Sequence, residues 1–252
     1  MDKVIPLFKS HYSLGRSILT LEKESVRYGP DSIIDIASQA SLKRVFLVED
    51  SMSGFLEAYK NLKEKGLSLS FGLRMTVCHD LKEKSEESLG KSAKYIVFAK
   101  NYEGYKRLIK IFSEASRSGF YYEFRSDFNA LKSIWNDNDL KLCVPFYDSF
   151  LYKNVLGTSI CVPDFGFTKP VFFVEENNLP FDYILKSKIE EFCSKNNFSY
   201  LNTKSIYYKN KSDFKSYLTF RCISNRTTLN KPEFSHMCSS EFSFESWKEK
   251  NA

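Results

Sequence analysis

Two adjacent carboxylates, Glu49 and Asp50, follow the short apolar run Val45-Phe46-Leu47-Val48, which is typical of a buried strand. A carboxylate pair at a strand end can bind a metal ion or act as a general base. The same pair precedes Ser51 and a helical pattern that begins near Gly54, where acidic groups stabilise the positive end of a helix. We favour the helix-cap interpretation and keep the two carboxylates as the catalytic candidates.

Other motifs that could do chemistry are incomplete. The chain contains three histidines, His11, His79 and His236, which are too few for a multinuclear hydrolase site. His236-Met237-Cys238 lacks the second ligand pair of a zinc site, and we expect it to pack in the core. Gly90-Lys91-Ser92 resembles the end of a phosphate-binding loop, but Ser85 stands where that motif needs a glycine. We interpret it as a charged loop.

Aromatic residues gather at Phe120-Tyr121-Tyr122 and Phe124, with Arg117 and Arg125 nearby. Such a cluster can stack nucleic-acid bases, although we expect packing in the core or against a subunit. The net charge of +6, from 37 Lys and Arg against 31 Asp and Glu, allows nucleic-acid binding without demanding it.

The six cysteines have no paired CxxC spacing and mostly lie beside apolar residues, as small core side chains do. We expect reduced thiols in a cytoplasmic protein. The first residues lack the apolar segment of a signal peptide, and no later run is long and apolar enough for a membrane helix, so no membrane partner is expected.

Strand-like and helix-like patterns alternate along the chain. The predicted strands are 45–48, 69–78, 95–99, 143–146, 171–175 and 199–201, and the predicted helices are 31–40, 54–65, 102–115, 182–195 and 212–222. The polar run 79–94 is expected to be a solvated loop. The alternation is typical of an α/β fold with a mostly parallel sheet, open or closed into a barrel, in one domain over residues 1–252.

Several segments, read in order, resemble the N-terminal PHP (polymerase and histidinol phosphatase) domain of a bacterial DNA polymerase III alpha subunit. The clearest is Ala99-Lys100-Asn101-Tyr102-Glu103-Gly104-Tyr105-Lys106-Arg107-Leu108, continued by Gly119-Phe120-Tyr121-Tyr122 and Arg125. Ser10-His11-Tyr12-Ser13 resembles the family's opening motif, and Ser240-Glu241-Phe242-Ser243-Phe244 resembles its close. The resemblance covers nearly the whole chain except about residues 131–179. It implies a PHP-type distorted β/α barrel in a stand-alone version.

The resemblance also implies that the metal site of the family is lost. The positions of its ligands fall on Leu7, Lys9, Glu49, Asp50, Arg74, Ser205 and Tyr207. Ammonium and guanidinium groups cannot bind a cation and repel one. We therefore expect no metal and no other cofactor.

Two further interpretations of the replaced site stay open. Lys9 and Arg74 can pair with Glu49 or Asp50, which fills the former metal cavity with charge. The two basic residues can instead hold a phosphate.

We therefore expect a non-catalytic PHP-like protein that acts in DNA replication by binding or stabilising a partner. The resemblance suggests a replicative DNA polymerase or a proofreading exonuclease subunit. The chain is not expected to be an enzyme by itself, because the match leaves no room for polymerase domains. Its richness in Lys, Asn, Phe, Tyr and Ser suggests an AT-rich genome, such as that of a phage.

Two alternatives from other functional classes stay open. One is a divergent phosphoesterase or 3′–5′ exonuclease that uses Mn or Zn, with a site of Glu49, Asp50, Asp148 and His11. The other is a DNA-binding module whose affinity falls steeply with salt.

Overall fold

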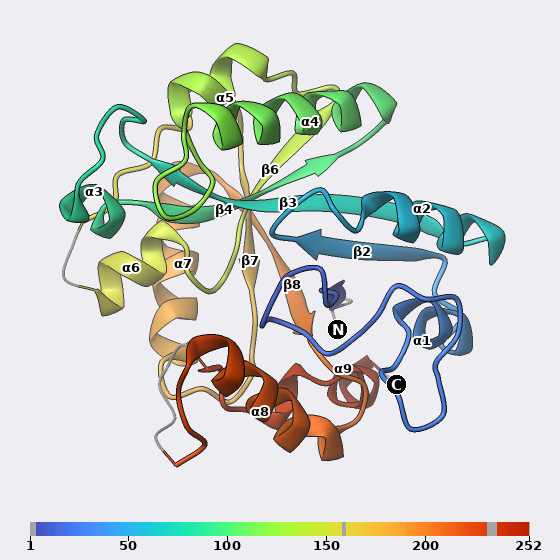
Figure 1. Cartoon of the computed structure of the whole chain (residues 1–252). Coiled ribbons are helices and arrows are strands. Elements are labelled where there is room, and N and C mark those ends of the chain that lie inside the picture. The colour runs from blue at the N-terminus through green and yellow to red at the C-terminus, as the bar shows by residue number, and fades with distance from the viewer. Residues whose placement is uncertain (1–3, 158–159, 231–235, 252) are drawn as a thin grey trace.

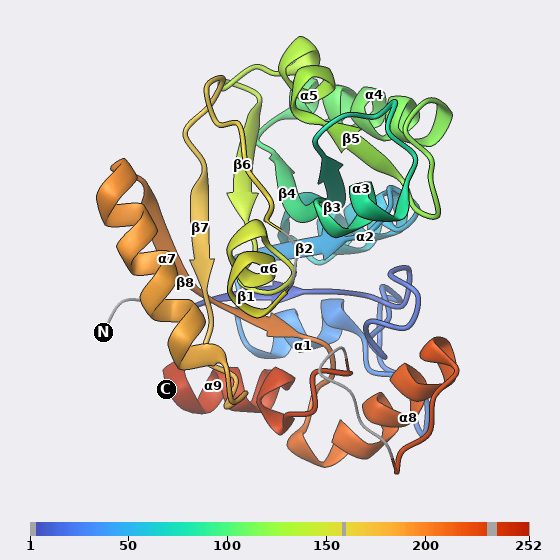
Figure 2. The same ribbon diagram turned by 90° about the vertical axis from the view of Figure 1, so that its left-hand side faces the viewer.

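The computed structural model describes residues 4–157, 160–230 and 236–251, and its strands form a barrel surrounded by helices (Figures 1 and 2). The strands are β1 (Ile5–Phe8), β2 (Arg44–Glu49), β3 (Ser68–Cys78), β4 (Ala93–Ala99), β5 (Arg125–Asp127), β6 (Leu140–Val144), β7 (Val171–Val174) and β8 (Ser199–Ile206). The α-helices are α1 (Ile33–Gln39), α2 (Phe55–Glu64), α3 (Glu86–Gly90), α4 (Tyr102–Arg117), α5 (Phe128–Ile134), α6 (Phe150–Leu156), α7 (Asp182–Asn196), α8 (Phe214–Asn225) and α9 (Phe244–Asn251). Two 3₁₀ helices, η1 (Lys211–Asp213) and η3 (Ser240–Phe242), lie near the C-terminus.

The sheet closes on itself in the order β2-β1-β8-β7-β6-β4-β3, because β3 pairs again with β2, while β5 lies on the edge of β3. The pairs are parallel except those of β4, which runs antiparallel to both β3 and β6. The predicted α/β class, the mostly parallel sheet and the PHP-type distorted barrel are therefore confirmed. The reversal of β4 was not predicted, since a short apolar run carries no information about strand direction.

Helix α4 illustrates how local sequence fixes an element against the barrel. The side chain of Asn101 caps its N-terminus by accepting a hydrogen bond from Gly104 N at 2.8 Å. Leu108, Ile111 and Ala115 lie on its buried face. Gly104 permits the close approach to β6, because a Cβ there would lie 2.2 Å from the carbonyl oxygen of Asp139.

The polar run 79–94 is only partly a loop, so this prediction was wrong in part. Helix α3 begins at a capping box in which Ser85 Oγ accepts from Ser88 N at 3.1 Å and Ser88 Oγ accepts from Ser85 N at 3.3 Å. A five-residue helix is too short to show apolar periodicity, so its local cap is its main sequence signal. Ala93 and Lys94 already belong to β4.

The apolar core has two parts. The larger part lies between the barrel and the helices and includes Phe8, Leu47, Val97 and Phe172. A smaller cluster fills the barrel interior, and we call it the interior layer: Leu7, Val48, Ile96, Phe98, Cys143 and Phe173. All cysteines except the exposed Cys238 are buried free thiols, which confirms the core prediction for them. Within the described ranges, none of the helices has the length and apolar character that crossing a membrane requires.

Candidate functional site

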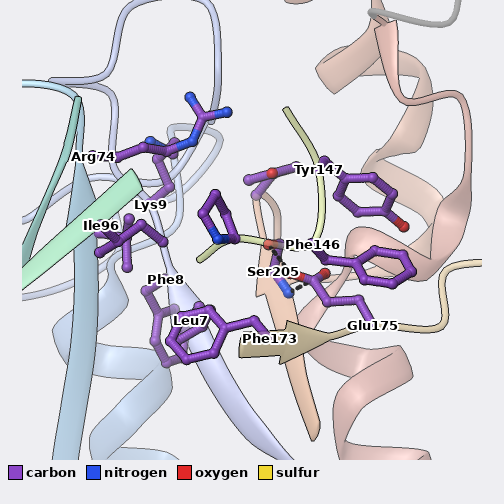
Figure 3. A pocket seen from close by; sticks show the side chains of 13 residues that line it. Leu7, Phe8, Lys9, Arg74, Ile96, Phe146, Tyr147, Phe173, Glu175 and Ser205 are labelled. Atoms are coloured by element: carbon purple, nitrogen blue, oxygen red, sulfur yellow. Dashed lines mark hydrogen bonds between the residues drawn. The ribbon is translucent and has the colours of Figure 1, made fainter. Parts of the chain in front are cut away.

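Five of the seven positions of the expected metal ligands line a small cavity at the end of the barrel where β1, β2, β7 and β8 finish: Leu7, Lys9, Arg74, Ser205 and Tyr207. We call this cavity the mouth, and Figure 3 shows its lining. It has a volume of about 40 Å³. Its lining residues are Leu7, Phe8, Lys9, Val48, Arg74, Ile96, Pro145, Phe146, Tyr147, Phe173, Glu175, Ser205 and Tyr207.

Strand register brings these positions together. Leu7 of β1 pairs with Ser205 of β8 and with Phe46 of β2. Glu49, the last residue of β2, pairs with Leu73 of β3. Asp50 and Arg74 are the residues that follow Glu49 and Leu73. Arg74 therefore lies level with the end of β2, although it is in the middle of the longer strand β3.

Four charged side chains form a chain of ion pairs at this end of the barrel, and two of them, Lys9 and Arg74, line the mouth. Lys9 Nζ lies 3.0 Å from Asp50 Oδ1, and Arg74 Nη1 lies 3.4 Å from the same oxygen. Arg74 Nη2 lies 2.5 Å from Oδ2 of Asp148, which follows β6. The two cationic side chains are nearly buried, whereas the two carboxylates are about one-third exposed. We call these four residues the charge network.

Electrostatics in the charge network favours the charged forms of both carboxylates. Burial by itself raises the pKa of Asp50, but attraction to Lys9, Arg74 and Arg16 outweighs it and holds the pKa well below its ordinary value. Burial also raises the pKa of Asp148, but attraction to the nearby cations, mainly to Arg74, outweighs this effect and lowers the pKa. For Lys9, burial prevails over the attraction of Asp50 and lowers the pKa of the ammonium group.

Glu49 lies beside the charge network and makes hydrogen bonds to the segment that connects β1 to α1. Its side chain is fully buried and accepts hydrogen bonds from Ser10 N at 2.8 Å and Ser13 Oγ at 2.5 Å. Ser13 Oγ in turn accepts from Asp50 N at 2.9 Å. Burial raises the pKa of Glu49, against the opposing effects of Lys9 and these hydrogen bonds.

The helix-cap interpretation of Glu49 and Asp50 was wrong. The N-cap of α2 is Gly54, and no side chain makes a capping hydrogen bond there. The chain makes a turn over residues 51–54 before the helix begins, and both carboxylates are held by residues that follow β1 instead: Asp50 by Lys9 and Glu49 by Ser10. The ion pair that the sequence suggested for Lys9 and Arg74 is present, with Asp50 as the shared partner.

The opposite wall is built around Glu175, which the sequence analysis did not single out. This buried carboxylate accepts from Ser205 N at 2.9 Å and from Ser205 Oγ at 2.7 Å (Figure 3). It also accepts from Asn177 Nδ2 at 2.8 Å. Burial raises its pKa. Its position directly after the apolar run of β7 was the available signal. Tyr207 stacks between the rings of Tyr217 and Phe242, at centroid distances of 5.7 and 5.1 Å.

The remaining candidate residues do not converge on the mouth. His11 packs its ring on Tyr12 at 4.4 Å, and its backbone N–H bonds Leu19. His236 is buried and lies 3.0 Å from the hydroxyl of Thr227, whereas Cys238 is exposed. The packing expected for His236 is therefore confirmed, but that expected for Cys238 was wrong.

The segment that resembles a phosphate-binding loop and the basic residue beside the aromatic cluster both have structural roles. Lys91 of the supposed phosphate loop directly follows α3 and pairs with Glu87 at 2.5 Å. Arg125 is fully buried and donates to the carbonyls of Gly119 and Glu83, both at 3.2 Å, so it holds a loop and cannot stack on a base. Packing was expected for the aromatic cluster, yet Tyr122 is 79% exposed.

The side chains of the mouth do not fit the metal centre that the resemblance implies for the family. Among residues 4–157, 160–230 and 236–251, no group of three or more His, Cys, Asp or Glu side chains is placed to hold a metal ion. Lys9 and Arg74 occupy two ligand positions with fixed positive charge, and Asp50 and Asp148 are bound to them. A cation placed there would be repelled by both basic groups.

Comparison with known protein families agrees with the fold. The family model for the PHP domain matches residues 9–148, which begin just after β1 and include the charge network and the strands from β2 to β6. The chain therefore belongs to the PHP domain family. A search of curated proteins returned no match.

Proposed function

We propose that this protein is a non-catalytic PHP domain that serves as a structural, partner-binding element in DNA replication. The observation that carries the first part is the charge network of Lys9, Asp50, Arg74 and Asp148, because its first three members stand where the resemblance places metal ligands. Asp50 and Asp148 are already paired with side-chain cations, and Glu49 and Glu175 are held by neutral hydrogen-bond donors. The PHP family includes phosphoesterases and polymerase-associated proteins, and the network favours a role without hydrolysis.

The replication part rests on sequence resemblance to the DNA polymerase III alpha subunit. The segment that carries most of it, Ala99–Leu108, forms the end of β4 and the start of α4 on the outside of the barrel. Tyr102 in this segment is 71% exposed, which leaves an aromatic side chain available to a partner. The proposed partner is a replicative DNA polymerase or a proofreading exonuclease subunit.

The experiment combines metal analysis with an exonuclease assay. Protein purified without chelators is analysed for bound Mn and Zn, and degradation of single-stranded DNA is measured with Mn²⁺ added. We expect neither stoichiometric metal nor activity. Stoichiometric metal together with activity that is lost in Asp50→Asn, but kept in the surface control Asp164→Asn, would make the chain a divergent hydrolase.

The partner is tested by capture with purified polymerase and exonuclease subunits at low and high salt. Retention at high salt is expected for a protein partner. Retention that disappears with salt and with nuclease treatment would instead indicate DNA binding.

A further inference from the structure

A second cavity lies at the opposite end of the barrel, where β1, β6, β7 and β8 begin. We call it the N-terminal pocket. Its volume of about 390 Å³ is roughly ten times that of the mouth and within the usual range of small-molecule sites. Leu7 and Phe173 line both cavities, so the interior layer closes the barrel between them.

The wall of the N-terminal pocket is mostly hydrocarbon. Phe46, Phe98, Phe173, Cys143 and Leu201 contribute aromatic, thiol and aliphatic surface. Burial raises the pKa of the Cys143 thiol to about 12, so this group is neutral and acts as part of the apolar wall. A ligand that removes such a surface from water gains affinity in proportion to its own apolar area.

The charged residues that line the N-terminal pocket are all basic: Arg44, Lys100 and Lys141. Lys141 Nζ donates to the carbonyl oxygen of Lys169 at 2.9 Å, and Lys100 Nζ donates to that of Asp137. Both ammonium groups are therefore held by backbone carbonyls, which carry no net charge.

The carboxylate of Asp139 is attracted to Lys100, and that of Asp137 is attracted to both lysines. Hydrogen bonds from Thr168 at 2.5 Å and Trp135 at 2.8 Å, and more weakly the two lysines, lower the pKa of Asp137. No carboxylate of the described chain lies within 4 Å of Arg44, which is solvent-exposed. The pocket consequently has an excess of positive charge.

One polar group on the wall lacks a partner. Thr203 is 3% exposed and lines the pocket, and its Oγ1 makes no hydrogen bond in the described structure. Native proteins rarely leave a buried hydroxyl unsatisfied. A polar atom of a bound molecule that reaches Thr203 would supply the missing hydrogen bond.

From the apolar wall, the basic lining and the unsatisfied hydroxyl, we infer that the N-terminal pocket binds a small amphipathic anion. The hydrocarbon part of this ligand lies between Phe46, Phe98 and Phe173, and its anionic group lies near Arg44, Lys100 and Lys141. This inference does not depend on whether the mouth is catalytic.

The test is calorimetric titration of the full chain with hexanoate, octanoate and decanoate, each below its micellar concentration. We expect saturable binding of one molecule that tightens about three- to fourfold for each added methylene until the pocket is full. Octylammonium has the same chain with the opposite charge, and we expect it to bind at least about tenfold more weakly than octanoate.

Two variants locate the site. Arg44→Gln removes an exposed charge without disturbing the core, and we expect octanoate to bind about two- to fivefold more weakly. Leu201→Glu places a carboxylate on the wall, and we expect a loss of about tenfold or more. Leu156→Glu is the matched control, since Leu156 and Leu201 are both 44% exposed and Leu156 lies on α6 away from the pocket.

Each contrary result decides against the inference. It is wrong if octanoate does not bind saturably, if octylammonium binds equally well, or if Arg44→Gln and Leu201→Glu both bind like the control. It is also wrong if sedimentation reveals a dimer that persists when octanoate is added and does not bind octanoate. A second copy of the chain would then cover the pocket.

Discussion

Replacing Arg74 by Met tests the charge network most directly. The change removes the guanidinium from two carboxylates and keeps a side chain of similar length in the interior of the mouth. Asp50 retains Lys9 at 3.0 Å, but Asp148 loses its ion-pair partner at 2.5 Å. Breaking a fully buried pair by removing one partner costs about 3–5 kcal/mol.

The expected cost for Arg74→Met is smaller, because both carboxylates are about one-third exposed and water can solvate them in part. We expect the free energy of unfolding to fall by about 2–3 kcal/mol. For a chain of this size, that corresponds to a decrease in Tm of roughly 4–12 °C. Urea unfolding followed by circular dichroism at pH 7 measures the change.

A double-mutant cycle separates the ion pair from lost packing. Asp148→Asn removes the partner charge, and we expect Arg74→Met to cost about 1–2 kcal/mol less in that background. The exposed pair Lys106–Glu103, at 2.6 Å, serves as a control with an expected coupling below about 0.5 kcal/mol. A coupling between Arg74 and Asp148 no larger than that of the control would refute the structural role of the network.

Three other perturbations have defined outcomes. Ser13→Ala leaves Glu49 without one donor and the backbone N–H of Asp50 without its acceptor, so we expect a loss of about 1–3 kcal/mol by urea unfolding. Gly104→Ala places a Cβ 2.2 Å from the carbonyl oxygen of Asp139, and we expect it to lower stability by about 1–3 kcal/mol and to lower the Tm in a thermal scan. Because the folded-state pKa of Asp50 is depressed, its stabilising contribution is complete above about pH 5 and is lost as the pH falls through the folded pKa. The difference in unfolding free energy between the native chain and Asp50→Asn should therefore narrow below about pH 4, and a constant difference would contradict this assignment.

Much of the fold was predictable because its strands are apolar runs and its long helices are amphipathic. The runs at 45–48, 69–78 and 95–99 became β2, β3 and β4 with small changes at their ends. The reversal of β4 could not be predicted, since direction depends on which strands it contacts and not on its own residues. Helix α3 was missed because a local cap, and not periodicity, determines it.

The site was predictable where it depended on charge type and less so where it depended on loop geometry. The pairing of Lys9 and Arg74 with an acidic residue followed from placing opposite charges in one cavity. Asp50 was assigned to a helix end because sequence distance to Gly54 is short, yet the turn between them separates the carboxylate from the helix. Glu175 was overlooked because a single acidic residue after a strand is common and carries little information.

The charge network gives a physical reason why carboxylates can converge at the end of this barrel without repelling one another. Carboxylates that converge at the end of a barrel repel one another unless positive charge lies between them, and in a metal site the cation provides it. Here Lys9 and Arg74 provide two positive charges from within the chain, opposite Asp50 and Asp148. The two acidic and the two basic side chains thus balance one another's charge from within the chain.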